Sequence, residues 1–153
     1  MYLVLFLIQV ISLLWGTAPI LAQGIRHVDD YGIQRGQQIA KSCFENYHPY
    51  SESYECLSDA LRRISKDNDD FAALGFTYYA FIIRGLHEES VRTNPREPAQ
   101  VKQSERKTLK GSQELLEVLQ RKLFVPFTDL CKITQTDCEV ANRLEQYWRT
   151  QTR

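Results

Sequence analysis

The chain has 153 residues, and its 19 Lys and Arg are balanced by 19 Asp and Glu, so its formal charge at neutral pH is zero. This balance gives no reason to expect a nucleic acid or an anionic membrane as the main partner. The length suits a single domain that buries about two thirds of the surface of its unfolded chain, so one hydrophobic core is expected.

The N-terminal segment has the pattern of an export signal. Residues 2–15 (YLVLFLIQVISLLW) form an apolar run without a charged side chain, and helix-weakening residues follow at 16–19. The small residue Ala22 then precedes a cleavage point, which predicts a signal peptide at residues 1–22 and an exported domain at residues 23–153. The alternative is that this segment is not cleaved and anchors the protein in a membrane, which is the one membrane contact that the sequence predicts. About 14 apolar residues are short against the ~20 that a spanning helix needs.

All four cysteines lie in the exported part, at Cys43, Cys56, Cys131 and Cys138. An even number of cysteines beside an export signal predicts two disulfides in an oxidising compartment. Proximity in sequence favours joining the first two and the last two, but loop-closure entropy does not by itself select among the three possible pairings. A structural zinc site is the alternative, although these pairs lack the short spacing that is usual for zinc-binding cysteines.

Helical periodicity dominates the exported part. Apolar or small residues recur three or four positions apart and predict a helix over residues 30–47, which ends at residues 48–49 (His-Pro). A second helix is expected to begin at residues 51–53, whose side chains can cap it. The two helices form an αα-hairpin, in which a bridge between Cys43 and Cys56 would join neighbouring backbones beside the turn.

A third helix is predicted to follow the polar cluster at residues 67–70. Residues 71–83 (FAALGFTYYAFII) contain no charge and have apolar side chains on every side of the expected helix. A helix of this kind is typical of a buried position, so it is expected to be the central helix of the core. Alternatively, its aromatic residues, Phe76 and Tyr79 among them, line a pocket for an apolar ligand or for a partner's helix.

The next segment is dense in charge and contains Pro95 and Pro98. Because it has few apolar residues, it is predicted to be a loop or exposed linker at about residues 87–108. Its basic residues are interleaved with acidic ones, which favours a solvated surface over a nucleic-acid patch.

Two further helices are expected after this linker. The first has leucines over residues 109–123 and ends before an extended Phe-Val-Pro-Phe stretch. Phe124 and Phe127 in that stretch either fill the edge of the core or dock on another protein. The last helix is expected to begin with a capping box formed by Thr136 and Glu139.

The whole pattern predicts an all-α fold, a small bundle of about five helices in which helical hairpins surround a buried central helix and two disulfides staple the chain. The sequence contains no recognisable catalytic motif. Its histidines, His27, His48 and His87, do not have the spacing of helical metal ligands. No catalytic, cofactor-binding or metal-binding residue is therefore predicted.

Three hypotheses on function follow. The favoured one is a non-enzymatic exported protein, periplasmic or extracellular, that binds another protein as an adaptor, inhibitor or accessory subunit. Its candidate contact residues are Phe76, Tyr79, Phe124 and Phe127. The second is a carrier of an apolar small molecule in an aromatic-lined helical cavity. The third is an enzyme whose site is assembled from residues far apart in sequence.

Overall fold

The structure is a computed structural model, and it describes residues 27–46 and 50–151. These ranges contain six helices and no strand, which confirms the predicted all-α fold. The helices are α2 (Asp30–Asn46), α3 (Tyr50–Lys66), α4 (Asp70–Thr93), α5 (Ala99–Leu123), α6 (Phe127–Ile133) and α7 (Cys138–Gln151). The signal peptide predicted at residues 1–22 and the helix end predicted at residues 48–49 lie outside the described residues.

Helices α2 and α3 form the predicted hairpin. A disulfide joins Cys43 in α2 to Cys56 in α3 with a Cα–Cα distance of 5.6 Å, near the end where the chain turns back. The buried face of α2 includes Ile33, Gly36 and Ala40, spaced as the sequence pattern predicts. This bridge therefore links two helices that already pack against each other, and the predicted pairing of neighbouring cysteines is correct.

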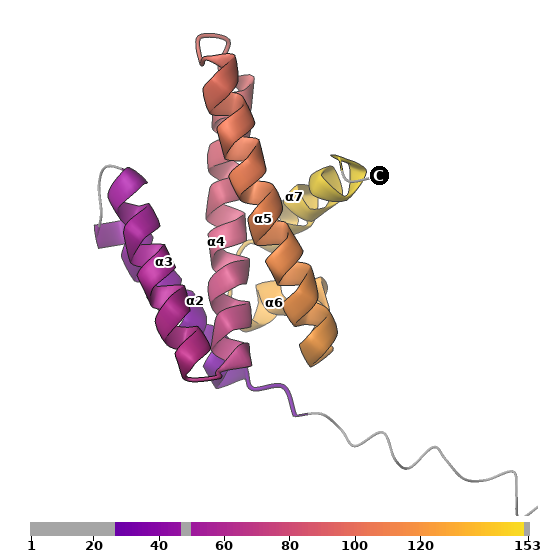
Figure 1. Ribbon diagram of the computed structural model, residues 1–153. Coiled ribbons are helices and arrows are strands. Elements are labelled where there is room, and N and C mark those ends of the chain that lie inside the picture. Colours follow the sequence, from indigo (N-terminus) through magenta and orange to yellow (C-terminus); the bar gives the residue numbers. More distant parts are fainter. Residues whose placement is uncertain (1–26, 47–49, 152–153) are drawn as a thin grey trace, which may run out of the picture.

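Helix α4 is the central helix of the bundle. It contacts α2, α3, α5 and α7, and in Figure 1 it lies between α3 and α5. The carboxylate of Asp69 caps it by accepting a hydrogen bond of 2.8 Å from the Ala72 N–H. Nearly every residue from Ala72 to Ile82 is buried, as expected for a helix that is apolar on all sides. Neither α4 nor any other helix in the described part of the chain is long and apolar enough to cross a membrane.

Helices α2 and α4 cross at two glycines. A Cβ atom at Gly36 would lie 1.8 Å from the carbonyl oxygen of Ala72, and one at Gly75 would lie 1.8 Å from the carbonyl oxygen of Ile33. Both distances are far below van der Waals contact, so each helix packs directly on the backbone of the other. Glycine is required at both positions because any side chain would push the helices apart.

The loop or linker predicted at about residues 87–108 is wrong. Helix α4 continues to Thr93 and α5 begins at Ala99, which leaves only residues 94–98 between the two helices. Both prolines of this segment fall in that short connection, and Pro98 directly precedes the first turn of α5.

The physical reason is that α4 and α5 extend beyond the other helices as a two-helix hairpin (Figure 1). Little apolar surface is available there, so charged residues with good helix propensity maintain the helices instead. Contacts between side chains add to this, since Arg92 pairs with Glu88 one turn away at 3.6 Å. His87 Nδ1 also lies 3.1 Å from the Glu105 carboxylate on the facing helix. Charge density therefore indicated exposure correctly for most of this segment, although Glu88 is buried, and exposure does not imply a loop.

The C-terminal part differs from the prediction in two details. The short helix α6 was not expected, because its seven residues are too few to show a helical period. The capping box of Thr136 and Glu139 is also wrong, since Asp137 Oδ1 accepts hydrogen bonds from the Glu139 and Val140 N–H groups at 2.9 and 3.2 Å. The Thr136 hydroxyl lies instead 2.8 Å from the Tyr78 hydroxyl, so it is already bonded within the core.

The second disulfide joins Cys131 in α6 to Cys138 in α7, with a Cα–Cα distance of 5.2 Å. It spans the turn between these two helices and confirms the second predicted pair. The four cysteines of the chain are therefore all bonded, and the zinc alternative is excluded because no thiolate is left to bind a metal.

Candidate functional site

The four aromatic residues predicted to form a contact surface lie in different surroundings. Phe76 faces α3 and α5 and is 3% exposed. Tyr79, on another side of α4, is half-buried and packs against Phe44 of α2 with ring centroids 6.3 Å apart. Burial also raises the pKa of Tyr79 above its ordinary value. These two side chains therefore do not share one surface.

Phe124 and Phe127 both border a hollow of about 540 Å³ at the end of α5. Phe127 is 5% exposed and packs edge-on against Tyr78, with ring centroids 5.2 Å apart. Phe124 is 70% exposed and has a left-handed backbone (φ 58°), with which it ends α5. The sequence left two roles open for this stretch, filling the core or facing outward. Phe127 fills the core, and Phe124 faces solvent.

A groove runs between α3 and α5, with α4 as its floor. We call it the α3–α5 groove; it has a volume of about 420 Å³. Its apolar lining consists mainly of Leu57, Leu61, Phe76, Ala80 and Leu115. The floor is apolar because α4 has apolar side chains on all sides. Helix α2 covers one of these sides, and another side forms the floor of the groove.

Gly111 keeps the groove open on the side of α5. It lines the groove, and a Cβ atom placed on it would have no other atom within 4 Å. The glycine is therefore not required by packing or by backbone conformation. Because Gly111 has no side chain, it leaves space in the groove opposite the apolar residues of α3.

One end of the groove is cationic. The Arg84 guanidinium lies over the ring of Tyr54, 4.7 Å from its centroid, and its Nη1 donates a hydrogen bond of 2.7 Å to Ser112 Oγ. Lys107 stands on the facing wall, and no acidic residue lines this groove. Within the described part of the chain, no carboxylate forms an ion pair with either cation. Arg84 is thus held in place by its neighbours while its charge is unneutralised.

Two buried polar atoms that belong to groove-lining residues lack a hydrogen-bond partner among the described residues. They are the hydroxyl oxygen of Thr77, a residue only 3% exposed, and Nε of Arg84. A buried polar group without a partner costs roughly 1–3 kcal/mol. Such groups are rare in native proteins. Both atoms are closed off from solvent, so an occupant of the open groove would reach them only if the lining rearranged.

The groove continues toward the start of α4, where carboxylates lie. A second hollow of about 290 Å³ is also lined by Leu61 and Leu115, and it reaches Asp69 and Asp70 at the start of α4. Asp70 is paired with Lys122 at 2.7 Å and Asp69 forms an ion pair with Arg35, so both carboxylates are balanced by cations within the fold. The two hollows together form an apolar path with Arg84 and Lys107 at one end and two ion-paired carboxylates at the other.

No family model, curated protein or solved structure matches this chain. The functional argument therefore depends on the geometry of the groove. Sequence reasoning missed Arg84 and Lys107, although Arg84 is the first charge after the uncharged run of α4. That position was the available signal, because a cation directly after a buried apolar run has few ways to reach solvent.

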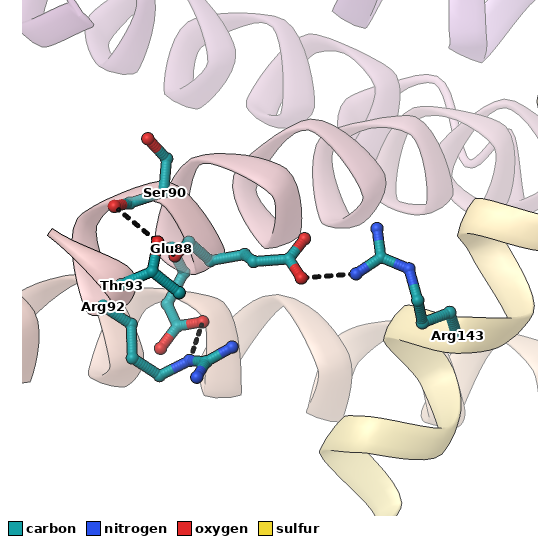
Figure 2. Close-up of polar contacts among 6 residues, drawn as sticks. Glu88, Ser90, Arg92, Thr93 and Arg143 are labelled. Carbon is teal, nitrogen blue, oxygen red and sulfur yellow. Dashed lines mark hydrogen bonds and ion pairs between the residues drawn. The ribbon is translucent and has the colours of Figure 1, made fainter.

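A second polar cluster joins α4 to α7 (Figure 2). Glu88 is 2% exposed, and Arg92 pairs with it at 3.6 Å while lying 4.8 Å from the ring centroid of Tyr147. Arg143 reaches from α7 to form an ion pair with Glu89 of α4. Because these charges pair with one another around a hollow of only about 200 Å³, we interpret the cluster as a structural attachment of α7.

A third polar group fastens α6 and its following turn to the core. Tyr78 has no exposed surface, and its hydroxyl lies 2.8 Å from that of Thr136, which is 3.1 Å from the hydroxyl of Thr134. The Gln37 amide of α2 donates a hydrogen bond of 2.7 Å to the Thr134 carbonyl. Burial raises the pKa of Tyr78, although its hydroxyl partners act in the opposite direction. In the described residues, no cluster of His, Cys, Asp and Glu has the arrangement of a metal site.

Proposed function

We propose that this protein is an exported, non-enzymatic binding module that accepts a helical segment of a partner protein in the α3–α5 groove. The observation behind the proposal is an apolar groove walled by two helices and open to solvent, with a cationic end. Laying the apolar face of an amphipathic helix into such a groove is a recurrent mode of protein recognition.

The dimensions of the groove favour a helix over a small apolar molecule. Its floor runs from Ala73 to Arg84 along α4, which at 1.5 Å per residue is about 16 Å, or roughly three helical turns. Sites for small ligands bury about 70–90% of the ligand surface. A groove with an open side leaves one face of its occupant in water, which suits an amphipathic helix.

The chemistry of the chain supports a location outside the cytoplasm. Two disulfides bond all four cysteines, and such bridges are typical of oxidising compartments. The apolar N-terminal run at residues 2–15 has the pattern of an export signal. Together they favour a periplasmic or extracellular protein.

The proposal is tested by filling the groove. The Gly111→Phe variant puts a ring into open space on the groove wall, so it should leave the fold intact and block the partner. Val118→Phe is the matched control, because Val118 is on the same helix, outside the groove and 51% exposed. The oxidised protein and both variants are used to capture partners from an extract of the native compartment, with thermal melting measured on each.

We expect the wild type and the Val118 variant to retain the same protein, and the Gly111→Phe variant to retain about tenfold less at an unchanged or higher melting temperature. Equal capture by all three would refute groove binding. Native mass spectrometry of the purified wild type supplies a second result. A bound small molecule displaced by Gly111→Phe, without any protein partner, would favour the carrier alternative instead.

A further inference from the structure

Charged residues lie at the two ends of the path formed by the α3–α5 groove and the adjoining hollow. The cations Arg84 and Lys107 lie at the end of the groove far from the start of α4, and Asp69 and Asp70 lie at the end near it. An apolar path connects them. Because Asp69 and Asp70 are paired with Arg35 and Lys122, a ligand that matches this pattern is apolar along its length and negative at the end that meets Arg84 and Lys107.

Arg84 is prepared to receive a carboxylate. Its guanidinium is fixed by the Tyr54 ring and by Ser112, so little side-chain freedom remains to be lost on binding. No carboxylate among the described residues forms an ion pair with it, so its charge is available to a partner. Guanidinium–carboxylate hydrogen bonds are among the strongest in proteins, so a partner carboxylate is the group that best fits this end.

An α-helix has the required polarity without any special sequence. Its dipole places about half a positive charge at the N-terminus and half a negative charge at the C-terminus. A helix with its C-terminus near Arg84 would meet a charge of opposite sign there, and its N-terminus would lie near Asp69 and Asp70, whose charges are already paired with Arg35 and Lys122. It would then run in the direction of α4 and antiparallel to the two helices that wall the groove.

From this arrangement, and resting on the proposed function, we infer that the partner is an amphipathic helix with Asp or Glu in its last turn. It lies parallel to α4 with that turn at Arg84 and Lys107. The carboxylate satisfies the Arg84 guanidinium, and the apolar face covers Phe76, Ala80 and Leu115.

The orientation is tested by photocrosslinking from two positions on α3. Ser58 lines the cationic part of the groove and Ser65 lines the acidic hollow, and both are exposed. They are seven residues apart, so they lie on one face of α3 about 10 Å from each other. The full chain with p-benzoylphenylalanine at either position is expressed in its native host and irradiated, and the crosslinked peptides are sequenced. Asp59 on the outer side of α3 is the control position.

We expect both positions to crosslink one partner helix, with Ser58 reaching its acidic C-terminal turn and Ser65 its N-terminal turn. The reverse order, or a last turn without Asp or Glu, would overturn the inference while leaving groove binding intact. Crosslinking to protein at neither position, or only at Asp59, would overturn the inference and the proposed function together. Crosslinking to a lipid or to nucleic acid would do the same.

Charge neutralisation gives an independent readout. We expect Lys107→Gln to lower the Ser58 crosslinking yield about threefold and Arg84→Gln about tenfold, since a charge-assisted hydrogen bond is lost. The control is Lys110→Gln on the same helix, because Lys110 pairs with Glu114 and does not line the groove. If all three variants crosslink like the wild type, the carboxylate contact is refuted. Circular dichroism melts of each variant separate this result from a loss of fold.

Discussion

Tyr78 is the residue whose titration is most clearly linked to the fold. It is fully buried, and burial raises its pKa above the ordinary value of about 10. The folded protein therefore holds the phenolic proton more tightly than the unfolded chain does. The contribution of protonated Tyr78 to the free energy of unfolding is fully present below about pH 10. It is lost as the pH rises through the pKa of Tyr78 in the folded state.

We expect Tyr78→Phe to lose about 1 kcal/mol of stability at neutral pH, because the Thr136 hydroxyl loses one of its two hydroxyl partners and keeps only Thr134. Above pH ~10 the variant should lose less stability than the wild type, since the buried phenol no longer has to ionise. Urea unfolding at neutral and alkaline pH measures both effects. Tyr31→Phe is the control, because Tyr31 is 77% exposed. An alkaline decline as steep in Tyr78→Phe as in the wild type would contradict the assignment.

Residue type alone could not separate the aromatic side chains. Phe124 and Phe127 are three positions apart in one short stretch, yet one is 70% and the other 5% exposed. The difference arises from the backbone, because α5 ends at Phe124 in a left-handed conformation and α6 begins at Phe127. Sequence patterns do not specify where two helices change direction, so they could not assign the two rings to different roles.

At the scale of elements, the crossing of α2 and α4 depends on contact between backbones. We expect Gly36→Ala and Gly75→Ala each to destabilise the protein by about 3 kcal/mol or more, because the added methyl group overlaps a main-chain carbonyl that cannot rotate away. Gly111→Ala, in open space, should instead stabilise by about 0.5–1 kcal/mol through helix propensity. Chemical denaturation of the three variants measures these changes. Similar effects for all three would show that helix propensity, and not contact, determines stability at these positions.

The sequence predicted the helices best where one face is apolar. The periodic segments became α2 and α3, and the uncharged run became the buried centre of α4. Prediction failed for residues 87–93 and 99–108, because the hairpin they form is stabilised by helix propensity and polar contacts more than by burial of apolar side chains. It also failed for α6, whose length is determined by the turn and disulfide around it.

At the scale of the whole molecule, both disulfides constrain short loops. The sequence separations are 13 residues for Cys43–Cys56 and 7 residues for Cys131–Cys138. Loop-closure entropy gives stabilisation of about 3 and about 2.5 kcal/mol respectively. Neither bridge spans the contacts between α2, α4 and α5, which therefore depend on packing and on side-chain contacts such as the ion pair between Lys122 and Asp70.

We expect the Cys43→Ala/Cys56→Ala variant to unfold at a lower urea concentration than the wild type, by an amount equivalent to about 3 kcal/mol. Its far-ultraviolet circular dichroism in buffer should stay helical, because the core packing of α4 remains. The Cys131→Ala/Cys138→Ala variant is expected to lose slightly less stability. Unchanged midpoints in both variants would show that the bridges do not constrain the unfolded chain.

The groove is a property of the assembled molecule, which is why sequence reasoning reached its floor but not its shape. Phe76 was identified from the apolar run, whereas Lys107 was placed in a supposed linker. These residues meet only because α3 and α5 pack on opposite sides of α4 (Figure 1). No local pattern specifies the spacing between two helices that pack on a third.

The local pairing of the cysteines also affects how the protein is made. A chain that emerges N-terminus first presents Cys43 and Cys56 together, long before Cys131 appears. Each native partner is the cysteine nearest in sequence, so the earliest oxidation is also the correct one. The order of synthesis itself then guards against mispaired intermediates, and maturation should need an oxidant but little help from a disulfide isomerase.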